Sequence, residues 1–246
     1  MKIGIIGAGM IGTTLAQRLA TAGHDVEIAN SRGPETIDPA ATSTGARAVE
    51  AEDVTADVDV VIVSVPISRV PDIASLVQAA PDSAVVIDTS NYYPLRDGRI
   101  PELEDGRVES LWVSAHYARP VVKAWNAITS QSFTAHASEP RDHNRIAIPV
   151  AGDDDAAKAT AMSLVEATGF VAFDAGPLAE SWRQQPGTPA YCTDRTAEEL
   201  PDALAKADAA RSPKRRDLAI AAVTERAEAE GSVSAEYLVR LNRAIY

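Results

Sequence analysis

The sequence predicts an α/β fold, with a doubly wound parallel sheet followed by a smaller, mainly helical C-terminal part. Two observations lead to this prediction. Short apolar runs rich in Val and Ile alternate with helical patterns up to about residue 175, and such runs are typical of strands buried on both faces of a parallel sheet. Beyond that point the patterns are helical, so we expect domains at residues 1–175 and 176–246.

The first strand, turn and helix lie within residues 1–32. An apolar run at residues 3–6 leads into a glycine-rich turn at residues 7–12, and a helical pattern continues from there until Gly23. A second apolar run, at residues 26–29, completes a strand–helix–strand unit about 30 residues long. In this context a G-x-G-x-x-G turn indicates dinucleotide binding.

Each glycine of this turn has its own role in such a site. Gly7 permits the tight turn, Gly9 lets the backbone approach a pyrophosphate, and Gly12 lets the helix pack closely on the strand. The helix begins at Met10 and Ile11, where free N–H groups and the positive end of the helix dipole favour phosphate. We therefore expect these five residues to form the cofactor's pyrophosphate site.

The end of the second strand indicates which dinucleotide binds. An NAD site usually has Asp or Glu about 20 residues after the glycines, where it binds the ribose 2′-hydroxyl. Residues 30–33 read Asn-Ser-Arg-Gly here, without a carboxylate. Arg32 can pair with a 2′-phosphate, and Asn30 and Ser31 can add neutral hydrogen bonds, so the turn predicts NADP. A short helix at residues 34–41 would add positive potential at the same place; a solvated arginine in a turn is the alternative.

Two further apolar runs end in polar loops. Residues 58–65 run into Pro66, and residues 84–88 run into Thr89. Ligands of open α/β sheets lie beyond the carboxyl ends of the strands. We therefore expect Val65, Pro66 and Thr89 near the cofactor, while the loop that begins at Thr89 is equally typical of capping by short polar side chains.

Residues 121–126 predict a sixth strand, and Lys123 lies within it. A buried ammonium group needs a partner. Either Lys123 lies at the end of the strand beside cofactor or substrate, or it pairs with a carboxylate. Residues 146–151 and 170–173 flank another helical pattern, so we expect one more strand–helix–strand unit to extend the sheet.

Composition argues against several partner classes. The net charge is −12 at pH 7, whereas nucleic acids and anionic membranes attract a surplus of Lys and Arg. The sequence contains no run of about 20 apolar residues, so it predicts no membrane span. The single cysteine, Cys192, excludes an internal disulfide and fits a reducing compartment, so we expect a cytoplasmic protein. No pattern typical of a metal site, a nucleophile or a catalytic triad stands out.

Four segments together carry a family resemblance: residues 5–12, 29–33, 64–66 and 151–153. With them the chain resembles the NADPH-dependent reductases of the deazaflavin coenzyme F-420. The resemblance covers essentially all of residues 1–175. Its most specific segment is the Asn-Ser-Arg-Gly turn, because many dehydrogenases share the glycine motif.

The resemblance implies a Rossmann-type domain that binds NADP, with the deazaflavin coenzyme F-420 as a small-molecule redox co-substrate. A hydride would pass from one ring to the other, and the protein would bind, orient and exclude water. By position, the implied NADP contacts are Thr13, Ser31, Arg32, Val65 and Pro66. A homodimer joined through the helical C-terminal part is also implied. After residue 90 the chain departs from the family at the places that would contact the acceptor.

A reductase of a small carbonyl or imine compound is the alternative function. That reaction needs a proton donor beside the hydride acceptor, and the sequence offers Lys123, His116 and Tyr117, of which Lys123 and His116 are the first candidates. An isolated histidine is more often a hydrogen-bonded loop residue than a catalyst. A protein that binds NADP without turning it over is a third class, since a fold alone does not settle function.

Overall fold

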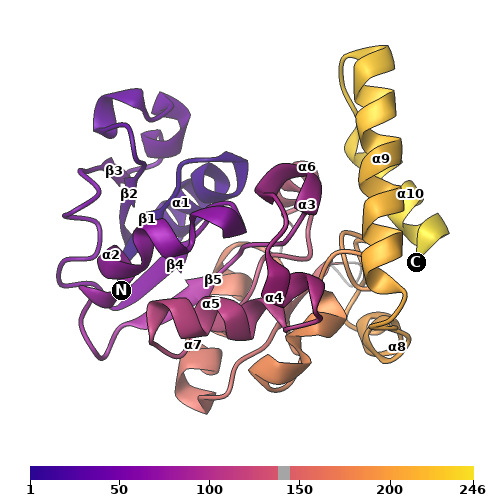
Figure 1. The fold of residues 1–246 in the computed structure, drawn as a ribbon. Coiled ribbons are helices and arrows are strands. Elements are labelled where there is room, and N and C mark those ends of the chain that lie inside the picture. The colour runs from indigo at the N-terminus through magenta and orange to yellow at the C-terminus, as the bar shows by residue number, and fades with distance from the viewer. Residues whose placement is uncertain (138–144) are drawn as a thin grey trace.

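Six parallel strands form the central sheet of the computed structural model, which describes residues 1–137 and 145–246. All neighbouring pairs are parallel, in the spatial order β3-β2-β1-β4-β5-β6 (Figure 1). The doubly wound α/β fold is therefore confirmed. The bounds are β1 Lys2–Ile6, β2 Asp25–Ala29, β3 Arg47–Ala48, β4 Val60–Val63, β5 Val85–Asp88 and β6 Val122–Lys123.

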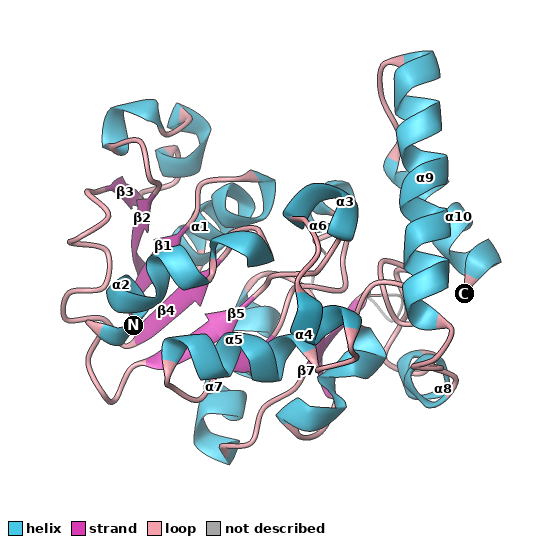
Figure 2. Cartoon of the chain, in the orientation of Figure 1, coloured by secondary structure: helices cyan, strands magenta, loops and turns pink. Residues whose placement is uncertain are grey.

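Helices cover both faces of this sheet and form the C-terminal end of the chain (Figure 2). The α-helices of the described residues are α1 Met10–Thr21, α2 Ala74–Gln78, α3 Pro94–Asp97, α4 Pro101–Glu104, α5 Glu109–Tyr117, α6 Ser130–Ala135, α7 Asp155–Ala167, α8 Leu200–Ala205, α9 Ser212–Glu230 and α10 Ala235–Ile245. A longer 3-10 segment, η5, spans Leu178–Gln184.

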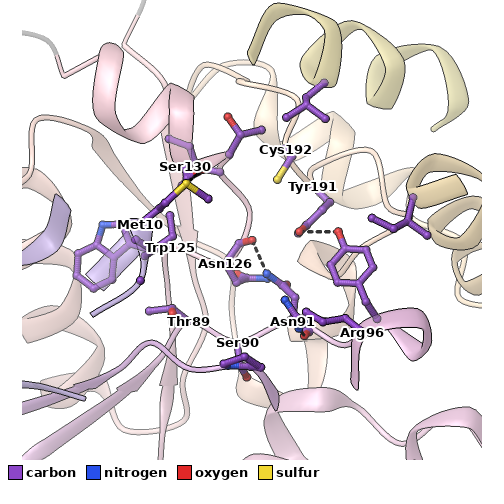
Figure 3. A pocket seen from close by; sticks show the side chains of 18 of the residues that line it. Met10, Thr89, Ser90, Asn91, Arg96, Trp125, Asn126, Ser130, Tyr191 and Cys192 are labelled. Carbon is purple, nitrogen blue, oxygen red and sulfur yellow. Dashed lines mark hydrogen bonds between the residues drawn. The ribbon is translucent and has the colours of Figure 1, made fainter. Parts of the chain in front are cut away.

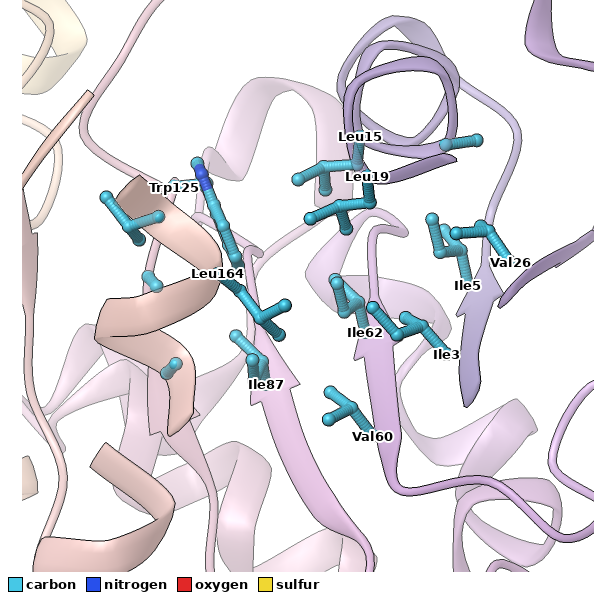
Figure 4. Close-up of a cluster of buried hydrophobic side chains, with 14 of the residues drawn as sticks. Ile3, Ile5, Leu15, Leu19, Val26, Val60, Ile62, Ile87, Trp125 and Leu164 are labelled. Atoms are coloured by element: carbon cyan, nitrogen blue, oxygen red, sulfur yellow. The ribbon is translucent and has the colours of Figure 1, made fainter. Parts of the chain in front are cut away.

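Two hydrophobic cores hold the layers together, because successive strand residues point to opposite faces. Val60 and Ile62 belong to the core that α1 and α7 cover, together with Leu164 (Figure 4). Val61 and Val63 belong to the second core, on the side of α2 and α5. All four strand residues are fully buried, as the continuous apolar run predicts for a strand inside a parallel sheet.

The last strand–helix–strand unit does not extend the sheet as expected. β7 (Ala147–Val150) and β8 (Val171–Asp174) pair in parallel with each other in a separate two-stranded sheet. A single antiparallel bridge, between Lys123 and Ala151, connects this unit to β6. Pro149 lies within β7 and has no N–H to donate, which suits an edge strand better than a central one.

The helix expected at residues 34–41 is also absent. Two short 3-10 turns replace it, Pro34–Thr36 and Pro39–Thr42. Pro39 has no N–H and would clash inside a continuous helix, so the segment breaks there. The first turn carries an acidic residue, Glu35, and therefore does not supply the positive potential that was expected.

The C-terminal part begins against the sheet domain and then leaves it. Segment η5 packs on α5 and β6, and Ser181 bonds to Ser110 at 2.9 Å. Helix α9 then extends away from the sheet, ends at Gly231 with a left-handed φ of 76°, and α10 packs beside it (Figure 1). The domain boundary at residue 175 stays a prediction. Among the described residues, no helix has the length and apolar character to cross a membrane.

Candidate functional site

A pocket of about 390 Å³ lies beyond the carboxyl ends of β4 and β5, at the start of α1 (Figure 3). It is next to the point where the strand order reverses between β1 and β4, where ligands of doubly wound sheets bind. One side, the strand-end wall, contains Gly9, Met10, Ile11, Val65, Pro66 and Thr89. The opposite side, the C-terminal wall, contains Tyr191, Cys192, Val223, Leu238, Asn242 and Tyr246.

The glycine turn has the geometry that a pyrophosphate needs. Gly7 has a φ of 111°, and side chains at Gly7 and Gly12 would collide with the carbonyl oxygens of Ser64 and Gly7. A Cβ at Gly9 would meet nothing within 4 Å, so the backbone there is open to the pocket. No side chain caps the start of α1, and its first turn has no acidic residue, which leaves N–H groups available to an anion.

The remaining cofactor candidates on the strand-end wall lie where they were expected. Val65 and Pro66 follow the end of β4, and Thr89 follows the end of β5. Thr89 is buried, and its N–H donates to the carbonyl oxygen of Val63 at 3.0 Å. Thr13, in contrast, lies one turn into α1 and does not line the pocket.

The Asn-Ser-Arg-Gly turn lies outside the pocket, at the end of β2. The side chain of Asn30 shapes the turn: its Oδ1 accepts from the Arg32 N–H at 2.8 Å, and its Nδ2 donates to Thr36 Oγ1 at 2.9 Å. Ser31 and Arg32 are exposed, and within the described residues neither side chain is bonded to another. They are therefore available to a phosphate, whereas Asn30 acts by holding the backbone.

Lys123 pairs with a carboxylate and does not reach the pocket. It is fully buried, and its Nζ donates to Asp88 Oδ2 at 2.6 Å and to the carbonyl oxygen of Ser90. Alternation along a strand would place Lys123 and Trp125 on one face. However, β6 has already ended at Lys123 and Trp125 has a φ of 55°, so the alternation does not extend to Trp125. Of the two arrangements considered for Lys123, the structure shows the ion pair.

His116 is also remote from the pocket. It lies near the end of α5, where its Nδ1 is 2.9 Å from the carbonyl oxygen of Trp112 and its ring packs against the Trp112 ring at an interplanar angle of 41°. It does not contribute to the lining. Neither catalytic candidate, Lys123 or His116, therefore lines this pocket.

A polar cluster that the sequence does not reveal lies across the pocket from the glycine turn. The Tyr93 hydroxyl donates to the Tyr191 hydroxyl at 2.8 Å, although 98 residues separate them. Asn126 Nδ2 donates to Asn91 Oδ1 at 3.1 Å. The guanidinium carbon of Arg96 lies 5.5 Å from the centre of the Tyr93 ring and completes the cluster. Tyr93 and Asn91 lie in a loop noted as polar, but no short-range pattern predicts Tyr191.

Burial keeps the two tyrosine hydroxyls of this cluster neutral, whereas Arg96 is charged and forms an ion pair with Asp97. Desolvation raises the pKa of Tyr93 and that of Tyr191 well above the ordinary value for tyrosine. Burial also raises the pKa of the Cys192 thiol. At neutral pH the pocket therefore presents two hydroxyl groups and a thiol to a ligand, and neither phenolate nor thiolate.

No group of three or more His, Cys, Asp or Glu side chains that could hold a metal ion occurs among residues 1–137 and 145–246. The groups available in the pocket are backbone N–H groups, hydroxyls, amides, the Cys192 thiol and the Arg96 guanidinium. They suit an organic ligand with phosphate groups better than a metal centre.

Comparisons with known proteins agree with this geometry. Residues 2–92 match the model of a family described as NADP oxidoreductase, coenzyme F420-dependent. The protein YjhV of Escherichia coli strain K12 is 51% identical over 61 residues, which cover 22% of this chain and 44% of YjhV. The match thus spans less than half of that relative.

Two crystal structures extend the likeness beyond the first strands. The hypothetical protein SMa0349 of Sinorhizobium meliloti is 30% identical, with a TM-score of 0.68 over 80% of this chain and 95% of that one. A protein of Arthrobacter sp. FB24, provisionally described as an F420-dependent NADP reductase, is 23% identical, with a TM-score of 0.57 over 74% of this chain and 87% of that one. At that identity the second likeness shows the fold.

Proposed function

We propose that the protein binds NADP(H) and transfers a hydride between its nicotinamide and a small-molecule acceptor. The match of residues 2–92 to the model of coenzyme F420-dependent NADP oxidoreductases supports this proposal. The observation that carries this proposal is the open backbone at Gly9, at the uncapped start of α1. There the protein offers N–H groups to a pyrophosphate at the rim of a pocket of about 390 Å³.

Each predicted contact has a distinct task in this proposal. Met10 and Ile11 start the helix that receives the pyrophosphate. Ser31 and Arg32 bind the 2′-phosphate, Arg32 through a planar pair of N–H donors. Val65 and Pro66 provide an apolar surface after the end of β4, in the strand-end wall of the pocket.

NADPH supplies a hydride when it is bound, so the side chains need only orient the two partners and exclude water. The C-terminal wall, formed by α9, α10 and the turn at Tyr191, closes the pocket opposite the strand ends. As acceptor we propose the deazaflavin coenzyme F-420, which the description of the family matched by residues 2–92 suggests. Thr89, in the strand-end wall of the pocket, would contact the reacting rings.

Titration and turnover test this proposal separately. NADPH binding is measured by calorimetry, and NADPH oxidation is then followed in the presence of oxidised deazaflavin coenzyme, at the absorbance of each partner. Parallel loss of both absorbances supports deazaflavin as the acceptor. Tight NADPH binding without turnover contradicts that acceptor, and absence of binding contradicts the whole proposal.

The tyrosine pair favours a second candidate, reduction of a small carbonyl or imine compound. Tyr93 and Tyr191 line the pocket as neutral hydroxyls, and such a group can donate a hydrogen bond to a developing alkoxide or amine. NADPH oxidation with a panel of small ketones and imines tests it. Because Tyr93 donates its hydroxyl proton in the hydrogen bond to Tyr191, Tyr191 is the hydroxyl that can donate to a substrate. Loss of that turnover in Tyr191→Phe, with unchanged NADPH binding, would favour it over deazaflavin reduction.

We also propose that the protein acts as a cytoplasmic homodimer. Its single cysteine suits a reducing compartment. Helices α9 and α10 stand away from the sheet and leave apolar side chains partly exposed, which a second copy can cover.

A further inference from the structure

A carboxylate lies on the turn that is proposed to bind the 2′-phosphate. Glu35 folds back over Gly33, where a Cβ would lie 2.6 Å from Glu35 Oε2 and 2.7 Å from Oε1. Gly33 has a φ of 95°. The carboxylate can approach the turn this closely because Gly33 has no side chain.

The charges around this turn are few and of opposite sign. Arg32 and Glu35 flank Gly33, and the described structure shows no ion pair at either of them. Arg47, on the neighbouring strand β3, is already bound to Asp25 at 2.7 Å and to Glu27 at 2.9 Å. Arg32 is therefore the cation offered to a ligand here, and Glu35 is the anion.

The local backbone holds Glu35 in this position. The Gly33 carbonyl oxygen accepts from the Thr36 N–H at 3.1 Å and from Thr36 Oγ1 at 2.9 Å. Thr36 Oγ1 also accepts a hydrogen bond from Asn30 Nδ2 at 2.9 Å. The 3-10 turn that carries Glu35 is thus tied directly to the turn that carries Arg32.

We propose that Glu35 is a specificity-determining residue. Its carboxylate repels the 2′-phosphate that Arg32 attracts, and so lowers the preference of the site for NADP over NAD. This inference rests on the proposed function, because it needs a dinucleotide whose adenosine ribose lies at residues 31–33. Both Glu35 and Arg32 are exposed, so water and salt screen their effects on a ligand. We expect a change of about threefold to tenfold when the charge of Glu35 is removed.

The test compares Glu35→Gln with wild type by titration of NADP⁺ and NAD⁺ at low ionic strength, without any acceptor. Adenosine 2′,5′-bisphosphate serves as a third probe, because it carries the 2′-phosphate and lacks the nicotinamide. The matched control is Glu228→Gln, which removes the same charge from an exposed residue far along α9.

In Glu35→Gln the dissociation constants of NADP⁺ and of the bisphosphate should fall about threefold to tenfold, while that of NAD⁺ changes by less than about twofold. The gain should shrink as salt is added. The Glu228→Gln control should bind all three probes as wild type does. An unchanged or lower preference for NADP⁺ in Glu35→Gln overturns the inference, even where the wild type binds NADP⁺ and the proposed function stands. A wild type that binds neither dinucleotide overturns the proposed function itself.

Discussion

A side chain at Gly9 would enter open space, whereas one at Gly12 would collide with the backbone of Gly7. The two glycines therefore separate ligand binding from folding. Gly9→Val should fold with nearly wild-type stability, since the φ of Gly9 is −81° and suits any residue, but it should lose dinucleotide binding. Gly12→Ala should unfold at lower denaturant concentration, because the helix must move off the strand.

Calorimetric titration of NADPH and denaturant unfolding of both variants check this contrast. Native circular dichroism in Gly9→Val ensures that lost binding is not lost structure. Wild-type NADPH affinity in Gly9→Val would contradict the assignment of the pyrophosphate site.

The 2′-phosphate assignment gives a second prediction at this scale. Arg32 is exposed and unpaired within the described structure, so Arg32→Ala should fold normally. Because a hydrogen bond to a charged group contributes about 1.5–3 kcal/mol, the preference for NADPH over NADH should fall about tenfold or more. Titration with both nucleotides measures it, and an unchanged ratio would remove Arg32 from the site.

The ion pair of Lys123 and Asp88 carries a third prediction. Lys123→Met leaves the buried Asp88 carboxylate without its cation, which typically costs about 3–5 kcal/mol of unfolding free energy. The double variant with Asp88→Asn should recover part of that loss, because no charge remains buried. Denaturant unfolding of the two single variants and the double variant gives the coupling; additive losses would be inconsistent with a direct pair.

The residues of the glycine turn could be predicted from sequence because their positions follow from short-range spacing within one strand–helix–strand unit. The role of Glu35 could not. Its carboxylate reaches Gly33 through a 3-10 turn, and the sequence is equally consistent with a helix that points the side chain elsewhere. Likewise, the partner of Lys123 lies 35 residues earlier, on the neighbouring strand.

At the scale of elements, helix α5 docks on the loop that follows β5 through a buried carboxyl group. Glu109 is 5% exposed, and its Oε2 accepts from the Tyr92 N–H at 3.1 Å. Desolvation raises the pKa of Glu109 from 4.5 to about 7, although Lys123 and this hydrogen bond act in the opposite direction.

This shift predicts how stability depends on pH. Between pH 4.5 and about 7 the folded protein keeps the Glu109 proton that the unfolded chain has released. The folded state binds more protons there, so its unfolding free energy falls as pH rises. The contribution of Glu109 is complete below pH 4.5 and lost as pH passes about 7. Glu109→Gln removes this dependence.

Urea unfolding of wild type and Glu109→Gln at pH 5 and pH 8 measures the effect. The variant should gain stability relative to wild type by up to about 3 kcal/mol between the two pH values. Parallel behaviour of the two proteins over this interval would contradict a raised pKa.

Elements with local signals were predicted well, and those that depend on distant pairing were not. The run of β4 is apolar throughout and buried on both faces, so its place inside the sheet follows from sequence. The unit β7–α7–β8 has the same local pattern, yet it forms its own small sheet. Pro149 within β7 and the left-handed backbone at Trp125, just after β6, are consistent with that outcome, but which strands pair depends on contacts between distant segments.

At the scale of the whole molecule, the pocket is made by segments from both ends of the chain. Gly9 and Tyr246 both line it. Helix α10 is held in place by Asn242, whose Nδ2 donates to the Cys192 carbonyl oxygen at 3.2 Å, and by Arg243, whose Nε donates to that of Thr193 at 2.7 Å. The sequence indicates a helical C-terminal part, but not that this part forms one wall of the site.

Helices α9 and α10 pack against each other as a helical hairpin, and this hairpin leads to a prediction about assembly. Leu218, on α9, is 58% exposed, and the apolar side of α10 is only partly covered within one copy of the chain. A second copy that packs on these helices would remove this apolar surface from water. The 26.0 kDa chain should therefore run as a dimer of about 52 kDa in light scattering.

Leu218→Asp should shift that equilibrium toward the monomer, because it places a charge in the apolar contact. Leu95 provides a matched control: it is 71% exposed but lies on α3, outside the hairpin, so Leu95→Asp should remain dimeric. A wild type that stays monomeric over the whole concentration range would refute the dimer. A dimer that only Leu95→Asp disrupts would move the interface from the helical hairpin to the sheet domain, and α9 and α10 would then serve the pocket alone.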